Sequence, residues 1–136
     1  DSLLLFLPLI LGDRLPAPLR TKLLAALEEP GRFLTPHGLA TESPRSRHYV
    51  PDGYWRGPIW APSTMIMVEA LRASGKADLA REIARRFCEM ARTTQMPENF
   101  DALTGKDLRD PGFAWTSAVY LVLAHELGET VVRTTP

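Results

Sequence analysis

The sequence has few residues that could hold the chain together through disulfides or metal ions. Its one cysteine, Cys88, lies in a stretch of helical periodicity, which excludes an internal disulfide and a cysteine-based zinc cluster. The three histidines, His37, His48 and His125, lack the spacing of a metal site, and His125 is expected in the core instead. We therefore expect no metal, and the scarcity of cysteine fits a reducing, cytoplasmic location.

Net charge and long apolar runs are absent as well. Sixteen basic residues balance sixteen acidic ones, so no broad electrostatic field attracts nucleic acid or an anionic membrane. The apolar run from Leu3 to Leu11 is far shorter than the roughly 20 residues of a membrane-spanning helix, and it lacks the flanks of a signal peptide. Neither nucleic acid nor a membrane is an expected partner, and the run is predicted to be a core helix.

The motifs of two common enzyme classes are missing. No glycine-rich phosphate loop is present, and Ser43, Ser46 and Ser63 lack the context of a nucleophile elbow. Nucleotide hydrolysis and serine-esterase chemistry are therefore excluded.

What is present is the composition of a globular domain, with 45% apolar and 24% charged residues. One domain covering residues 1–136 is expected. Because the chain starts within an apolar run, with almost no polar residues before it, we expect this domain to be part of a longer protein.

Helical periodicity dominates the sequence, and strand patterns are nearly absent. Helices are expected at residues 2–11, 18–29, 58–73, 76–93 and 113–127. The first, third and fifth are apolar on most sides, which predicts burial, whereas the second and fourth are amphipathic. This alternation predicts an all-α fold of helical hairpins, each with one inner and one outer helix.

Two connections, residues 30–57 and 94–112, each lead from an outer helix to an inner one. If the layers alternate, both connections open at the same end of the helical array. The first is much longer than the roughly 2–8 residues that usually join helices, and long ordered loops are commonly functional. We therefore expect the functional site at this shared rim.

The first connection ends in the aromatic segment DGYWRGPIW at residues 52–60. Aromatic rings such as those of Tyr54, Trp55 and Trp60 stack on sugar rings, and the Arg56 guanidinium can donate to paired hydroxyls. Gly57 would let the backbone approach a ligand. The alternative is that the aromatic residues belong to the core and Arg56 anchors the loop; composition alone does not separate the two interpretations.

The second connection contains two carboxylates, Glu98 and Asp101, spaced closely enough to reach one cleft. A carboxylate there could deprotonate a water molecule. The simpler alternatives are a solvated loop acid at Glu98 and a turn-capping side chain at Asp101.

Three segments, YWRGPIW (54–60), ENFDALTG (98–105) and FAWTSA (113–118), together resemble the C-terminal half of trehalase-like glycosidases with an (α/α)6 barrel. The stretch FLTPHGLATESP (33–44) resembles the loop that precedes the tryptophan-rich motif in these enzymes. The similarity is greatest to bacterial relatives of processing α-glucosidase and mannosylglycerate hydrolase, and it covers nearly the whole chain.

The resemblance implies the C-terminal part of an (α/α)6 toroid, and an inverting hydrolase that acts on an α-glucoside or a related α-glycoside without a cofactor. It implies that Glu98 is the general base and that the general acid is an aspartate outside this chain. It also implies that the remainder of the barrel is supplied by a longer form of this protein or by a second chain. The implied sugar contacts are Tyr54, Trp55, Arg56, Gly57, Trp60, Asp101 and Trp115.

Two other functions remain open on the sequence. One is a non-catalytic sugar-binding or scaffolding helical domain, and the other is a helical interaction module without sugar affinity. An aspartate-bearing loop upstream of Asp1 would argue against the first, and titration of a sugar against tryptophan fluorescence would test the second. The hydrolase itself requires the Glu98 carboxylate to lie close to the tryptophans.

Overall fold

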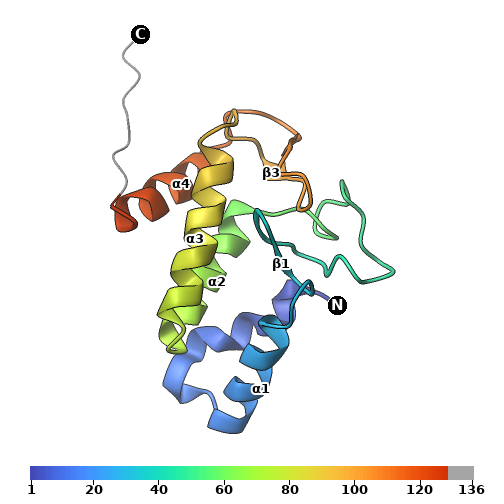
Figure 1. Ribbon diagram of the computed structural model, residues 1–136. Helices are drawn as coiled ribbons and strands as arrows, with labels where there is room; N and C mark the ends of the chain where they lie inside the picture. The colour runs from blue at the N-terminus through green and yellow to red at the C-terminus, as the bar shows by residue number, and fades with distance from the viewer. Residues whose placement is uncertain (129–136) are drawn as a thin grey trace.

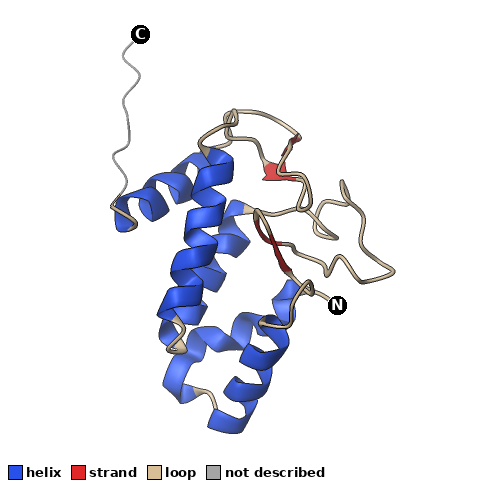
Figure 2. Ribbon diagram, in the orientation of Figure 1, coloured by secondary structure: helices blue, strands red, loops and turns tan. Residues whose placement is uncertain are grey.

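The computed structural model describes residues 1–128 and is predominantly helical, as Figures 1 and 2 show. In chain order, its elements are η1 (Leu3–Arg14), α1 (Ala17–Leu27), β1 (Leu34–Thr35), β2 (Gly38–Leu39), α2 (Ala61–Ala73), α3 (Ala77–Ala91), β3 (Asn99–Phe100), β4 (Asp107–Leu108) and α4 (Ala114–Glu126). All the predicted helices are present with small differences at their ends, which confirms the predicted helical class.

The apolar run at the N-terminus forms the 3-10 helix η1. Its buried residues recur at every third position: Leu3, Phe6, Leu9 and Gly12. This is the period at which side chains of a 3-10 helix share a face. The prediction that the run is buried on every side is wrong for residues 1–128, since Leu4 is 61% and Leu5 is 59% exposed. No described element covers those faces.

The end of η1 packs tightly against the end of α2. Gly12 turns the chain with φ 54, and a Cβ atom at this position would lie 2.5 Å from the carbonyl oxygen of Ala73. A larger residue would therefore clash with the α2 backbone. The Ser74 hydroxyl also donates to the Leu9 carbonyl over 2.8 Å. These contacts fix the orientation of η1 relative to α2.

The fourth predicted helix, α3, is amphipathic as expected, whereas α1 is so only in part, because Leu24 and Leu27 are buried but Leu19 is 44% exposed. In α3 the buried face contains Ile83, Phe87 and Met90, whereas Arg81 and Arg85 are exposed. Figure 1 shows α3 in front of α2, with η1 and α1 at the opposite end from α4. The predicted pairing of α2 with α3 as a hairpin is confirmed, because the two helices pack together and only Ser74–Lys76 joins them.

Burial of the fifth predicted helix, α4, is only partial among the described residues. Leu123 and Ala124 are buried, but Leu121 is 50% and Val122 is 43% exposed. His125 is exposed, so its expected core position is wrong. The helix contacts α2 and α3 on one side and has no described neighbour on the other. Residues 1–128 therefore bury only part of the apolar surface of α4.

Two short antiparallel hairpins, which the sequence did not indicate, shape the two long connections. β1 pairs with β2, and β3 pairs with β4. An isolated bridge joins Ile59 to Phe100, with hydrogen bonds of 2.8 and 3.0 Å between their backbones. Because Ile59 lies between the first connection and the start of α2, and Phe100 lies in the second connection, the prediction that both open at one rim is confirmed.

No helix within residues 1–128 is long and apolar enough to cross a membrane. The structure agrees here with the shortness of the apolar run.

We expect Glu82→Gln to reduce the amount of folding stability that the protein loses as the pH falls. Hydrogen bonds from Arg85 and Arg86 lower the pKa of the Glu82 carboxyl from 4.5 to about 2. A carboxyl whose pKa falls on folding adds stability above its unfolded pKa and loses it as the pH drops through the folded value. Thermal unfolding of the full-length protein should therefore lose more stability between pH 4.5 and 2 in the wild type than in the variant. Equal losses would contradict this role.

Candidate functional site

The candidate site lies at the rim where the two long connections meet. Glu98 immediately precedes β3, and Tyr54 lies in the aromatic segment before α2. The Tyr54 hydroxyl donates to Glu98 Oε1 over 3.3 Å, although the residues are far apart in the sequence. The structure thus places the predicted base carboxylate directly beside the predicted sugar-binding segment.

Four aromatic rings form one cluster next to Glu98. Trp55 stacks on Trp60 with 4.2 Å between ring centroids and an interplanar angle of 10°. Tyr54 meets Trp60 edge-on at 4.7 Å, and Trp115 meets it at 5.6 Å. Trp55 is 44% exposed and borders an apolar pocket that Leu4 and Ile66 also line. An exposed, supported indole is a suitable surface for the apolar face of a pyranose.

Backbone geometry helps to hold this cluster in place. Tyr54 has φ 60, a left-handed conformation that is uncommon for residues other than glycine and often occurs at functional sites. Its carbonyl accepts a hydrogen bond of 3.0 Å from the indole nitrogen of Trp60. Both the ring and the backbone of Tyr54 are therefore tied to the base of the aromatic cluster, while its hydroxyl points to Glu98.

Two predicted sugar contacts need correction. Within residues 1–128, Trp60 has 0% exposure and therefore offers no surface to a ligand. Its ring instead stacks against the ring of Trp55. Gly57 is also buried, and a Cβ there would lie 2.4 Å from the Val50 carbonyl oxygen and 3.0 Å from the Tyr49 ring. The reason for glycine is therefore close packing of the loop on itself, and not the approach of a ligand.

Asp101 has the turn-capping geometry that was the simpler alternative. Its Oδ1 accepts hydrogen bonds from the backbone of Leu103 at 2.9 Å and of Thr104 at 2.8 Å. Arg56 is exposed, and its guanidinium has no hydrogen-bond or ion-pair partner among residues 1–128. Arg56 is thus free to bind a ligand, whereas a sugar contact from Asp101 stays a prediction.

Trp115 stands at the start of α4 and joins the site from the third motif. Its indole nitrogen donates to the carbonyl of Glu98 over 3.3 Å, and its ring packs on Phe113 at 4.9 Å. The ring is 37% exposed, so it can border a ligand as predicted from the resemblance. All three motifs therefore converge on Glu98.

The structure also shows residues near the site that the sequence interpretation missed. Arg109 pairs with Asp52 at 2.7 Å, which ties the tip of the second connection to the first. The Tyr49 hydroxyl and the Asn99 carboxamide are buried without hydrogen-bond partners in the described residues. Burial raises the pKa of Tyr49, and the charge of Asp101 adds to the effect. No sequence pattern marks these positions apart from their nearness to the motifs.

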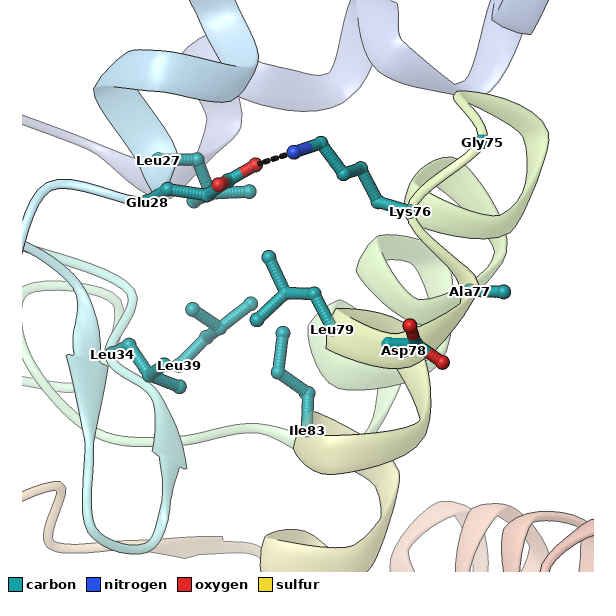
Figure 3. A pocket seen from close by; sticks show the side chains of 10 residues that line it. All are labelled: Leu27, Glu28, Leu34, Leu39, Gly75, Lys76, Ala77, Asp78, Leu79 and Ile83. Atoms are coloured by element: carbon teal, nitrogen blue, oxygen red, sulfur yellow. Dashed lines mark ion pairs between the residues drawn. The ribbon is translucent and has the colours of Figure 1, made fainter.

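A separate cavity of about 490 Å³ lies between α1, the β1–β2 hairpin and the start of α3, and Figure 3 shows it. Leu34, Leu39 and Ile83 line its apolar floor. Lys76 pairs with Glu28 at 2.6 Å across its edge. This cavity contains neither tryptophan nor Glu98, so size alone does not make it the better sugar site. The described residues also contain no cluster of side chains suited to a metal ion.

Glu98 itself is partly buried, with Oε1 engaged by the Tyr54 hydroxyl. An ionised carboxylate can accept about four hydrogen bonds, so this contact orients the group and leaves acceptor capacity for a water molecule. The site therefore has one oriented carboxylate, one exposed indole platform and one cation, on loops held by a helical scaffold.

Comparison with solved structures finds the same scaffold in glycoside hydrolases. The crystal structure of the GH63 mannosylglycerate hydrolase from Thermus thermophilus in complex with glucose is similar, with a TM-score of 0.73 and 31% identity, over 89% of this chain and 28% of that one. The structure in complex with Tris and D-glycerate gives a TM-score of 0.74 at 31% identity, over 89% of this chain and 29% of the other.

Sequence comparison is more specific. Residues 1–116 match the family model of the mannosylglycerate hydrolase MGH1-like glycoside hydrolase domain, and the chain belongs to this family. It is 32% identical to mannosylglycerate hydrolase of Thermus thermophilus over 116 residues, and 32% identical to glucosylglycerate hydrolase of Mycolicibacterium hassiacum over 120 residues. Each match covers 85% of this chain but only 28% and 27% of those proteins, respectively. The predicted relationship to mannosylglycerate hydrolase is confirmed.

Proposed function

We propose that this chain is part of the catalytic domain of an inverting glycoside hydrolase and that Glu98 is its general base. The observation that carries the proposal is the position of the Glu98 carboxylate, which accepts a hydrogen bond from Tyr54, whose ring in turn meets Trp55 edge-on with 6.0 Å between centroids. Family membership supports the reaction class. A cytoplasmic location, expected from the sequence, stays a prediction.

In the proposed reaction, an acid from outside the described residues protonates the glycosidic oxygen as the bond to the anomeric carbon breaks. A water molecule attacks that carbon from the opposite face, and Glu98 takes its proton. Inversion requires roughly 6.5–9.5 Å between the two carboxyl groups, so that the water fits between base and sugar. Tyr54 orients the base, and Trp55, Arg56 and Trp115 bind the sugar.

We further propose that the substrate is a hexose joined by an α-linkage to glycerate. Two relatives are named for hydrolysis of mannosylglycerate and glucosylglycerate, and two crystal structures of the Thermus thermophilus mannosylglycerate hydrolase contain glucose or D-glycerate. In this chain, the exposed Arg56 next to Trp55 suits an anionic aglycone beside a stacked sugar. Which hexose is preferred depends on walls of the pocket that other residues supply.

The remainder of the barrel would cover the apolar surfaces that residues 1–128 leave exposed. These surfaces lie on η1 and α4, at Leu4, Leu5, Leu121 and Val122. Exposed groups of large apolar side chains such as these normally contact further protein. The chain spans less than a third of the relatives named above, which supports a partner segment in cis.

The experiment that tests this function follows the anomer released by the full-length protein. Mannosylglycerate and glucosylglycerate are incubated with the enzyme, and proton NMR spectra are recorded before mutarotation equilibrates the sugar. The β-anomer should appear first from an α-linked substrate. Initial release of the α-anomer would contradict inversion, and binding of either compound without hydrolysis would favour a non-catalytic sugar-binding domain.

A further inference from the structure

The segment that carries Glu98 is held by an unusual set of hydrogen bonds. The carbonyls of residues 95–98 each accept one bond from the stretch 112–116. The donors are the backbone nitrogens of Gly112 (2.8 Å, to Gln95) and Phe113 (2.7 Å, to Met96), the Thr116 hydroxyl (2.7 Å, to Pro97) and the Trp115 indole nitrogen (3.3 Å, to Glu98). The stretch 112–116, which leads into α4, therefore holds every carbonyl of residues 95–98 in place.

Within this set, Thr116 differs from the other hydroxyl residues at helix starts. Ser117, its neighbour, donates to the carbonyl four residues earlier, and Thr64 does the same at the start of α2. Thr116 reaches the Pro97 carbonyl instead, 19 residues away in the sequence. Its side chain is fully buried at 0% exposure, so water cannot take its place. A buried carbonyl that loses its hydrogen-bond donor lowers the stability of the folded state, so this contact is expected to be maintained.

The residues before Glu98 add to the constraint that this contact places on the carboxylate. Met96 has φ 50, so the chain reverses there in a left-handed conformation, and Pro97 has no N–H group with which to bond elsewhere. The peptide leading into Glu98 is held at two atoms: the Pro97 carbonyl accepts from the Thr116 hydroxyl, and the Glu98 N–H donates to the Asp110 carbonyl over 2.9 Å. Rotation of this peptide would swing the carboxylate away from its position beside Tyr54.

We propose that Thr116 is a positioning residue for the general base, acting through the Pro97 carbonyl. This inference rests on the proposed function. The Thr116 hydroxyl donates to Pro97 in the second connection, whereas the aromatic platform formed by Trp55 and Trp60 comes from the segment that precedes α2. Its loss should therefore reduce the rate of the chemical step more than sugar binding. Misplacement of a catalytic group by about 1 Å can cost about a hundredfold in rate.

The test compares Thr116→Val and Thr116→Ser in the full-length protein, with mannosylglycerate or glucosylglycerate as substrate, whichever the wild type hydrolyses faster. Valine keeps the shape but removes the hydroxyl, so kcat should fall about ten- to a hundredfold while KM changes less than about threefold. Serine keeps the hydroxyl and should restore kcat to within about threefold of the wild type. Thr93→Val is the control, because the Thr93 hydroxyl donates only within the end of α3, to the Met90 carbonyl.

Each outcome decides the proposal. Normal kcat in Thr116→Val overturns it, as does an equal loss in the serine variant. If the valine variant does not fold, Thr116→Ala and Thr116→Ser are compared in the same way, and equal rates overturn the inference. Wild-type enzyme without hydrolysis would instead refute the proposed function and the positioning role together, whereas an inactive Glu98→Gln variant with a normal Thr116→Val variant would refute only the positioning role.

Discussion

Glu98→Gln in the full-length protein is expected to lower kcat by about 10²- to 10⁴-fold, because the amide cannot take a proton from the attacking water. Glutamine is isosteric and still accepts a hydrogen bond through its carbonyl oxygen, so the contact with the Tyr54 hydroxyl can persist. Sugar affinity should therefore remain close to that of the wild type. Steady-state kinetics with mannosylglycerate and glucosylglycerate, together with titration of tryptophan fluorescence, measure the two quantities separately.

The control for this substitution is Glu89→Gln, at an exposed position on α3 where the carboxylate pairs with Arg85. It makes the same chemical change away from the rim, so kcat should stay within about twofold of the wild type. Near-normal turnover of the Glu98 variant would remove Glu98 from the role of base. A loss of sugar binding equal to the loss of kcat would show that its role is structural.

Trp60→Ala is expected to destabilise the protein by about 3–5 kcal/mol, the usual cost of removing a large buried aromatic side chain. Trp60 has 0% exposure and contacts Tyr54, Trp55 and Trp115 by ring packing. Its indole nitrogen also holds the Tyr54 carbonyl, so the variant loses a hydrogen bond as well. Denaturant unfolding of the full-length protein, followed by circular dichroism, would show the shift.

Trp55→Ala is the matched comparison, because Trp55 stacks on Trp60 but is 44% exposed. Its loss should cost only about 0.5–1.5 kcal/mol of stability, the size of one aromatic pair. We expect kcat/KM to fall about tenfold or more, as the exposed stacking surface disappears. If both variants lost stability equally and kept sugar affinity, the platform would be a core element and not a binding surface.

Much of the fold could be predicted from periodicity. The alternation of apolar and amphipathic helices gave the layered hairpins, and α3 shows the buried and exposed faces that its pattern predicts. The predicted meeting of the two connections followed from the parallel direction of inner helices. The burial of η1 and α4 could not be predicted in this way, because apolar composition records the surroundings of the whole protein and residues 1–128 supply only part of them.

The candidate site was predicted by motif, and its geometry was not. Residue type indicated an aromatic sugar platform and a carboxylate, but it could not show that Trp55 is exposed and Trp60 buried. Packing separates them, since one indole is exposed and the other lies beneath it. The same holds for Asp101, where a turn-capping geometry is visible only once the backbone hydrogen bonds are known.

The sequence by itself determined the helical class, the positions of the helices, the two long connections and the resemblance to this family of hydrolases. These are local properties, because they depend on the spacing and type of residues that are close together in the sequence. Only the tertiary structure decided that Tyr54 meets Glu98 and that Thr116 reaches Pro97. Such contacts join residues distant in sequence, and their formation depends on how the helices pack, which no local pattern encodes.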